Sequence, residues 1–128
     1  MMRVFDASAV LALIFGEAGA DKAAALVADG DGAISSVNLA EVASRLLDTG
    51  YSPRDVDATC AGLRLQVLPF TAEDGLAAGH LRTETRSLGL SLGDRCCLAA
   101  ARTHAKAHVV TADRPWKALK GFRVTLIR

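Results

Sequence analysis

The sequence predicts an α/β fold in which a central parallel β-sheet is flanked by helices. Short apolar, β-branched segments alternate with longer helix-forming segments along the whole chain, a pattern typical of parallel sheets with helices on both faces. The 128 residues correspond to one domain, and 51% of them are hydrophobic, which is enough to build a core. We therefore expect a single domain over residues 1–128.

The first half of the chain shows this alternation clearly. We expect strands at residues 3–5 and 33–35, and helices over residues 7–15, 17–29 and 38–49. Each of the three helices is followed by a glycine, and the third has apolar residues at a helical period. Ser52 and Pro53 favour a further helix, because Ser is a good N-cap and Pro is tolerated at the first helical position.

The second half continues the pattern. We expect strands at residues 65–70, 108–111 and 122–127, helices over 72–88 and 94–106, and a helical turn at 116–120. No linker-like composition interrupts these elements. In such folds, ligands bind beyond the carboxyl ends of the strands.

Four acidic residues fall at strand ends or near helix starts, and these are Asp6, Glu41, Asp94 and Asp113. Helix N-termini meet the carboxyl ends of strands along one edge of a parallel sheet, so we expect all four to face one pocket. Taken singly, each acid has an ordinary explanation. Asp6, Asp94 and Asp113 can be N-caps, while Glu41 and Asp94 fit capping boxes with Asn38 and Ser91.

Convergent carboxylates repel one another. At about 4 Å and an effective dielectric constant near 20, each pair costs roughly 4 kcal/mol. A protein tolerates this cost by protonating one acid or by binding a cation. Because the available ligands are oxygens, the expected cation is Mg²⁺ or Mn²⁺, and such sites are suited to phosphodiester hydrolysis.

Charge and cysteine content limit the possible partners and compartments. Residues 1–94 carry seven Lys or Arg against thirteen Asp or Glu, whereas residues 95–128 carry eight against one. This basic end is either a phosphate-facing surface or a set of solvated helix faces.

The three cysteines have no disulfide or zinc spacing, which favours a reducing cytoplasm. No stretch reaches the roughly 18 to 20 apolar residues of a membrane helix.

The sequence resembles the PIN-domain family, and within it the VapC-type toxins, over essentially the whole chain. Four segments carry the resemblance, and they are Val-Phe-Asp-Ala-Ser-Ala at 4–9, Asn-Leu-Ala-Glu-Val at 38–42, Leu-Ser-Leu-Gly-Asp-Arg at 90–95 and Val-Thr-Ala-Asp-Arg-Pro-Trp at 110–116. The resemblance implies a three-layer α/β fold and Mg²⁺- or Mn²⁺-dependent endoribonuclease activity.

Matching these segments residue by residue makes Asp6, Glu41 and Asp94 the core acids, with Asp113 at a more variable fourth position. Ser8 and Thr111 match positions that support the acidic pocket through a hydroxyl; their ordinary alternatives are a local cap and a strand end. The resemblance also implies an RNA substrate such as transfer or ribosomal RNA, a VapB-type antitoxin and a homodimer. Arg95 and Arg114 follow two of the acids and are either phosphate contacts or surface arginines.

Three other functions remain to be compared with this one. An aspartyl phosphatase needs a second carboxylate two residues after the first, where this chain has Ser8. A phospho-acceptor domain needs neighbouring acids at the first strand end and a lysine on the last strand's rim, and neither arrangement is found. An inactive PIN-like scaffold that only binds RNA or a protein partner is the third alternative.

Overall fold

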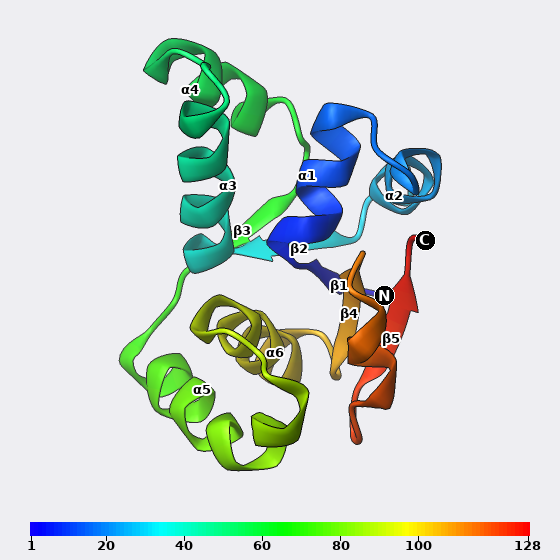
Figure 1. Cartoon of the computed structure of the whole chain (residues 1–128), viewed down its shortest axis with the longest axis vertical. Helices are drawn as coiled ribbons and strands as arrows, with labels where there is room; N and C mark the ends of the chain where they lie inside the picture. Colours follow the sequence, from blue (N-terminus) through cyan, green and yellow to red (C-terminus); the bar gives the residue numbers. More distant parts are fainter.

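The computed structural model of the chain describes all of residues 1–128 and contains one five-stranded sheet (Figure 1). All strands are parallel, in the order β3-β2-β1-β4-β5. Their bounds are Arg3–Phe5 for β1, Gly32–Ser35 for β2, Gln66–Leu68 for β3, His108–Thr111 for β4 and Arg123–Leu126 for β5. The first strand is therefore central, and the chain builds outward from it in both directions.

Six α-helices cover the two faces of the sheet, giving the three layers that the sequence predicted. They are α1 (Ala7–Phe15), α2 (Ala20–Ala28), α3 (Ser36–Asp48), α4 (Pro53–Ala61), α5 (Ala72–Thr85) and α6 (Leu92–His104). Two short 3-10 helices, η1 (Arg86–Leu88) and η2 (Arg114–Ala118), complete the chain. Figure 1 shows α1 to α4 on one side of the sheet and α5 with α6 on the other. No helix is long and apolar enough to cross a membrane.

Alternate residues of the central strands supply the two cores. Val4 and Val109 pack with the side chains of α5 and α6, whereas Phe5 and Val110 pack with those of α1 to α4. This two-residue period follows from strand geometry, in which successive side chains point to opposite faces. Trp116 is fully buried in the α5–α6 core. The residues of β2 are all buried and those of β1 and β4 are buried or half-buried, whereas the edge strands β3 and β5 are partly exposed.

Helix caps explain where several elements begin. Ser52 and Ser91 cap α4 and α6, and their hydroxyls accept hydrogen bonds from the amides of Asp55 and Asp94. The third helix begins at Ser36, two residues earlier than expected, because Ser35 is its N-cap. Glu41 therefore lies in the second turn of α3 rather than in its first turn, which corrects the position expected from the sequence.

The carboxyl ends of the strands carry the segments with the conspicuous acids. Asp6 directly follows β1, and Asp113 follows β4 after one intervening residue. The start of α3 directly follows β2, and α3 packs against α6 across the same edge. The fold thus gathers four segments that are far apart in the sequence along one rim.

Candidate active site

One open pocket of about 350 Å³ lies at the rim formed by the carboxyl ends of β1 and β4. It is lined by Asp6, Ala7, Ser8, Leu11, Glu41, Asp94, Ala112, Asp113 and Arg128. All four of the acids that the sequence singled out are among these residues. Carboxylates from three different helix starts and one helix face therefore share one solvent-filled space.

Asp6 is the most buried of these acids and the best anchored. Its Oδ1 accepts a hydrogen bond from the Ala9 amide at 2.8 Å, and the Thr111 hydroxyl donates to Oδ2 at 2.6 Å. The Ser8 hydroxyl lies 2.7 Å from Oδ1 and 2.9 Å from Oδ2. Ser8 and Thr111 thus both contact this carboxylate directly, and their oxygens are 3.3 Å apart.

Burial raises the pKa of Asp6 from 3.8 to about 6. The hydrogen bonds from Thr111, Ala9 and Ser8 lower the pKa but do not offset the loss of hydration, and the charge of Asp94 raises it slightly further. The side chain is a nearly inaccessible carboxylate, 3% exposed, whose donors are all neutral. A bound cation would supply the charge compensation that these neutral donors lack.

Glu41 is held by a bridge between α3 and α6. The Asn38 side-chain amide donates to Glu41 Oε1 at 2.6 Å and to the Gly93 carbonyl at 3.0 Å. A Cβ on Gly93 would lie 2.6 Å from Glu41 Cδ, so the carboxylate rests directly on this glycine. Asn38 and Gly93 therefore position Glu41, and neither was singled out for that purpose in the sequence.

Asp94 and Asp113 occupy helix starts with different local bonding. Asp94 completes a capping box in α6, since its Oδ2 accepts from the Ser91 amide at 2.9 Å. Asp113 is the N-cap residue of η2, yet its side chain makes no capping hydrogen bond. A capping role therefore explains the presence of Asp94 at the start of α6. It does not explain Asp113, whose side chain makes no capping hydrogen bond.

The electrostatics of the pocket are dominated by unpaired negative charge. None of the four acids forms an ion pair with a Lys or Arg side chain. Burial raises the pKa of the Cys97 thiol in α6 well above its ordinary value, and the charges of Asp6, Asp94 and Glu41 raise it further. The charges of three of the acids therefore act on one buried thiol.

The carboxylates do not yet form a compact ligand set. No three His, Cys, Asp or Glu side chains are grouped closely enough to hold a metal ion as they stand. The physical reason is that separate partners hold three of the acids, Asp6 by two hydroxyls, Glu41 by Asn38 and Asp94 by the Ser91 amide. The sequence led us to expect closer convergence than the structure contains.

The family model of the PIN domain matches residues 3–121 of this chain. The chain belongs to the PIN-domain family. The match spans all four acids and every element from β1 to η2.

Three solved structures share the fold of this PIN domain at low sequence identity. They are "Toxin-antitoxin complex from Klebsiella pneumoniae" (22% identity, TM-score 0.77, 98% of each chain), "Crystal structure of VapBC2 from Rickettsia felis bound to a DNA fragment from their promoter" (21%, 0.74, 98% of each) and "Crystal structure of DNA bound VapBC from Salmonella typhimurium" (18%, 0.72, 100% of each). A sequence comparison with curated proteins gives no match.

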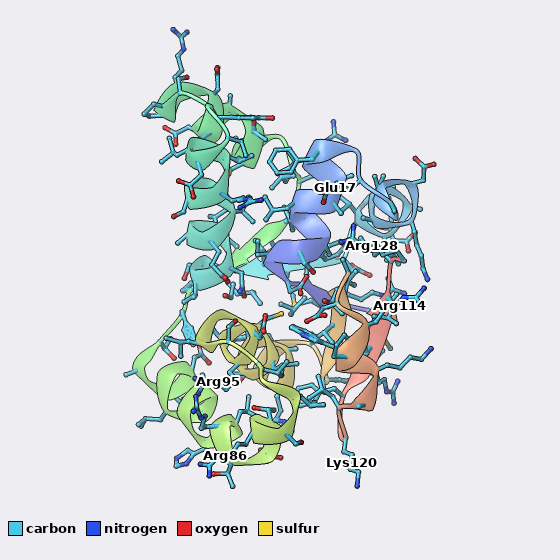
Figure 2. All side chains as sticks on the ribbon, viewed as in Figure 1. Glu17, Arg86, Arg95, Arg114, Lys120 and Arg128 are labelled. Atoms are coloured by element: carbon cyan, nitrogen blue, oxygen red, sulfur yellow. The ribbon has the colours of Figure 1, made fainter.

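The two arginines that the sequence suggested as phosphate contacts do not line the pocket of this PIN domain. Arg95 is 9% exposed, and its Nη1 donates to the Ala78 carbonyl of α5 at 3.3 Å. Figure 2 places it on the α5 side, away from Arg114 and Arg128. Arg114 is exposed at the start of η2, beside Asp113, but does not reach the pocket wall. Arg95 is therefore unsuited to binding RNA.

Arg128 is the basic residue that the sequence analysis missed. It lines the acidic pocket, and its Nη1 donates to the Ala18 carbonyl at 3.2 Å and lies 3.9 Å from Glu17 Oε1. The backbone of Ile127 packs closely against Gly19, and this contact places the next residue, Arg128, at the pocket. A Cβ on Gly19 would lie only 2.6 Å from the Ile127 carbonyl oxygen. No local pattern could have revealed this position, since it depends on contact between the residue that follows β5 and the loop before α2.

Proposed function

We propose that this PIN domain is a metal-dependent endoribonuclease that hydrolyses phosphodiester bonds in RNA. One observation supports the proposal most strongly: four carboxylates line a single pocket, and none of them has a cationic partner. An all-oxygen donor set of this kind suits hard divalent cations, with Mg²⁺ and Mn²⁺ the best candidates. No histidine lines the pocket, so the donor set does not suit softer metals.

Asp6, Glu41, Asp94 and Asp113 are the proposed metal-holding and catalytic residues. When bound, Mg²⁺ or Mn²⁺ would lower the pKa of a water molecule and stabilise the leaving oxygen. Asp6 must be ionised, and Ser8 and Thr111 orient it through their hydroxyls. Because the acids are not grouped closely enough as they stand, Glu41 and Asp94 would have to move closer to Asp6 to share one ion. Asp94 can keep its bond to the Ser91 amide, since only its Oδ2 accepts that hydrogen bond.

We further propose that the chain is the toxin of a toxin–antitoxin pair. The titles of the solved structures that share its fold describe toxin–antitoxin and VapBC complexes. The proposed partners are accordingly a VapB-type antitoxin, a second copy of the chain in a homodimer, and transfer or ribosomal RNA as the substrate. The alternative is an inactive scaffold that binds RNA or protein, which the loose grouping of the acids favours.

The test is an RNA cleavage assay with purified protein free of antitoxin. Structured RNA is incubated with the protein in EDTA, in Mg²⁺ and in Mn²⁺, and the products are separated on a denaturing gel. The proposed nuclease cuts only with metal and loses this activity in Asp6→Asn. Binding without cleavage under every metal condition would favour the scaffold.

Gly93→Ala should lower cleavage without destabilising the protein. The added methyl group displaces the Glu41 carboxylate, and a misplacement of about 1 Å at a catalytic group costs on the order of a hundredfold in rate. The displaced atoms end a flexible side chain, so the fold itself accommodates the change. Gly79→Ala is the matched control, because a Cβ at that helical position meets nothing within 4 Å.

Single-turnover cleavage rates and urea unfolding of the two variants check this prediction. Gly79→Ala should cleave like the unmodified protein and gain about 1 kcal/mol of stability, because alanine favours a helix more than glycine does. Equal cleavage rates in Gly93→Ala and Gly79→Ala would show that the position of Glu41 does not matter.

A further inference from the structure

A second hollow continues directly from the acidic pocket along the face between α1 and α3. Its volume is about 410 Å³, and it shares Ala7, Ser8, Leu11, Glu41 and Arg128 with the acidic pocket. Three residues line it outside the acidic pocket, and these are Phe15 and Glu17 near the end of α1 and Arg45 on α3. The two hollows therefore form one groove, which we call the α1–α3 groove, with the acids at one end.

Two arginines belong to the lining of this groove and are available to bind anions. Arg45 is exposed and forms no ion pair. Arg128 has 41% of its side chain exposed, and its nearest carboxylate oxygen, on Glu17, is 3.9 Å away. Figure 2 shows Arg128 and Glu17 near the α1–α2 side of the molecule. An exposed pair at that distance is weak, so a phosphate can replace Glu17 as the partner of Arg128.

An aromatic ring completes the groove. Phe15 lines it with a half-buried side chain, and its ring packs edge-on against Tyr51 with centroids 6.5 Å apart at 72°. This contact with Tyr51 supports one side of the ring. Aromatic side chains combined with arginines along a groove are the features by which proteins hold single-stranded nucleic acid, with bases stacked on rings and phosphates at the cations.

We propose that the α1–α3 groove binds the single-stranded RNA segment next to the scissile phosphate, with Arg45 and Arg128 contacting phosphates and Phe15 stacking on a base. The proposal rests on the proposed nuclease function, because the acidic end of the groove is where the cut would occur. It assigns the binding of the substrate strand to three residues outside the four proposed metal-holding acids.

The experiment measures RNA binding by fluorescence anisotropy in the Asp6→Asn background, which is expected to bind without cutting. The probe is a short, unstructured, labelled RNA in Mg²⁺ buffer, titrated at several KCl concentrations. Arg45→Gln and Arg128→Gln should each reduce the slope of log K against log salt by about 0.7, the value for one lost phosphate contact on a single strand. Phe15→Leu should weaken binding about tenfold with the slope unchanged.

Arg54→Gln is the matched control, because Arg54 is an exposed arginine of α4 that has no ion pair and does not line the groove. Thermal unfolding of each variant verifies that the fold is retained. The same probe annealed into a duplex should bind more weakly than the single strand.

Two results overturn the proposal. The first is that the three groove variants have the same slopes and affinities as Arg54→Gln. The groove would then bind something other than RNA, such as a protein segment. Equal affinity for duplex and single strand would show that Phe15 does not stack on an exposed base. Failure of the nuclease proposal is seen separately, as absence of metal-dependent cleavage by the unmodified protein.

Discussion

Asp94→Asn should reduce RNA cleavage by about a thousandfold, whereas Asp74→Asn should leave it within twofold. The loss corresponds to about 4 kcal/mol of transition-state stabilisation, the scale expected when a metal-holding carboxylate is removed. Cleavage rates measured under single-turnover conditions at saturating Mn²⁺ check the prediction. The comparison is informative because the two aspartates have the same local role in the fold.

Both aspartates are the third residue of a helix and complete a capping box. Asp74 accepts from the Thr71 amide at 3.0 Å at the start of α5, and Asp94 accepts from the Ser91 amide at 2.9 Å at the start of α6. Asparagine can still accept this hydrogen bond, so each variant loses only a favourable charge at a helix N-terminus, about 0.3 to 1 kcal/mol. Only Asp94 lines the pocket. Equal losses of cleavage in the two variants would mean that Asp94 acts as a helix cap alone.

Asp6→Asn should remove the activity and make the stability of the metal-free protein less dependent on pH. In EDTA, the unfolding free energy of the variant relative to that of the unmodified chain should be higher at pH 8 than at pH 4 by about 2.5 kcal/mol. The physical reason is the pKa of Asp6, which burial raises to about 6 from 3.8. A shift of this size is worth about 3 kcal/mol, and asparagine does not ionise.

The direction of this effect follows from proton binding. Between about pH 4 and pH 6, the folded protein keeps a proton on Asp6 that the unfolded chain has already released. The contribution of Asp6 to stability is therefore greatest at low pH and falls as the pH rises through that range. Urea unfolding of both proteins at several pH values checks the prediction, and a stability difference that does not vary with pH would contradict it.

Much of the fold follows from local patterns, and these were readable in the sequence. Val4 and Phe5 lie in a short apolar segment that ends at an acid, and the structure makes that segment the central strand. Glycines and Ser-capped starts marked most helix ends to within about three residues. The difference that matters for the site is at the start of α3, where Asn38 was considered as a cap. Ser35 takes that role, which leaves the Asn38 side chain free to bind Glu41 and α6.

The candidate site was predictable only in part. The topology of a parallel sheet brings Asp6 and Asp113 to one rim, because both follow strands that end there. The contacts that position Glu41 and Arg128 join residues far apart in the sequence, Asn38 with Gly93 and Gly19 with Ile127. Local patterns carry no information about such contacts. For the same reason, Arg95 could not be assigned to the pocket or to the interior from its place beside Asp94.

The central claim is that the acids of this pocket act together as the binding site of a hard divalent cation. Calorimetric titration of Mn²⁺ into the chelator-treated protein tests it most directly, using the unmodified chain, Asp6→Asn, Asp94→Asn and Asp74→Asn. We predict saturable binding that weakens at least tenfold, about 1.4 kcal/mol, in the first two variants and is unchanged in Asp74→Asn. Equal Mn²⁺ affinity in all four proteins would contradict the claim.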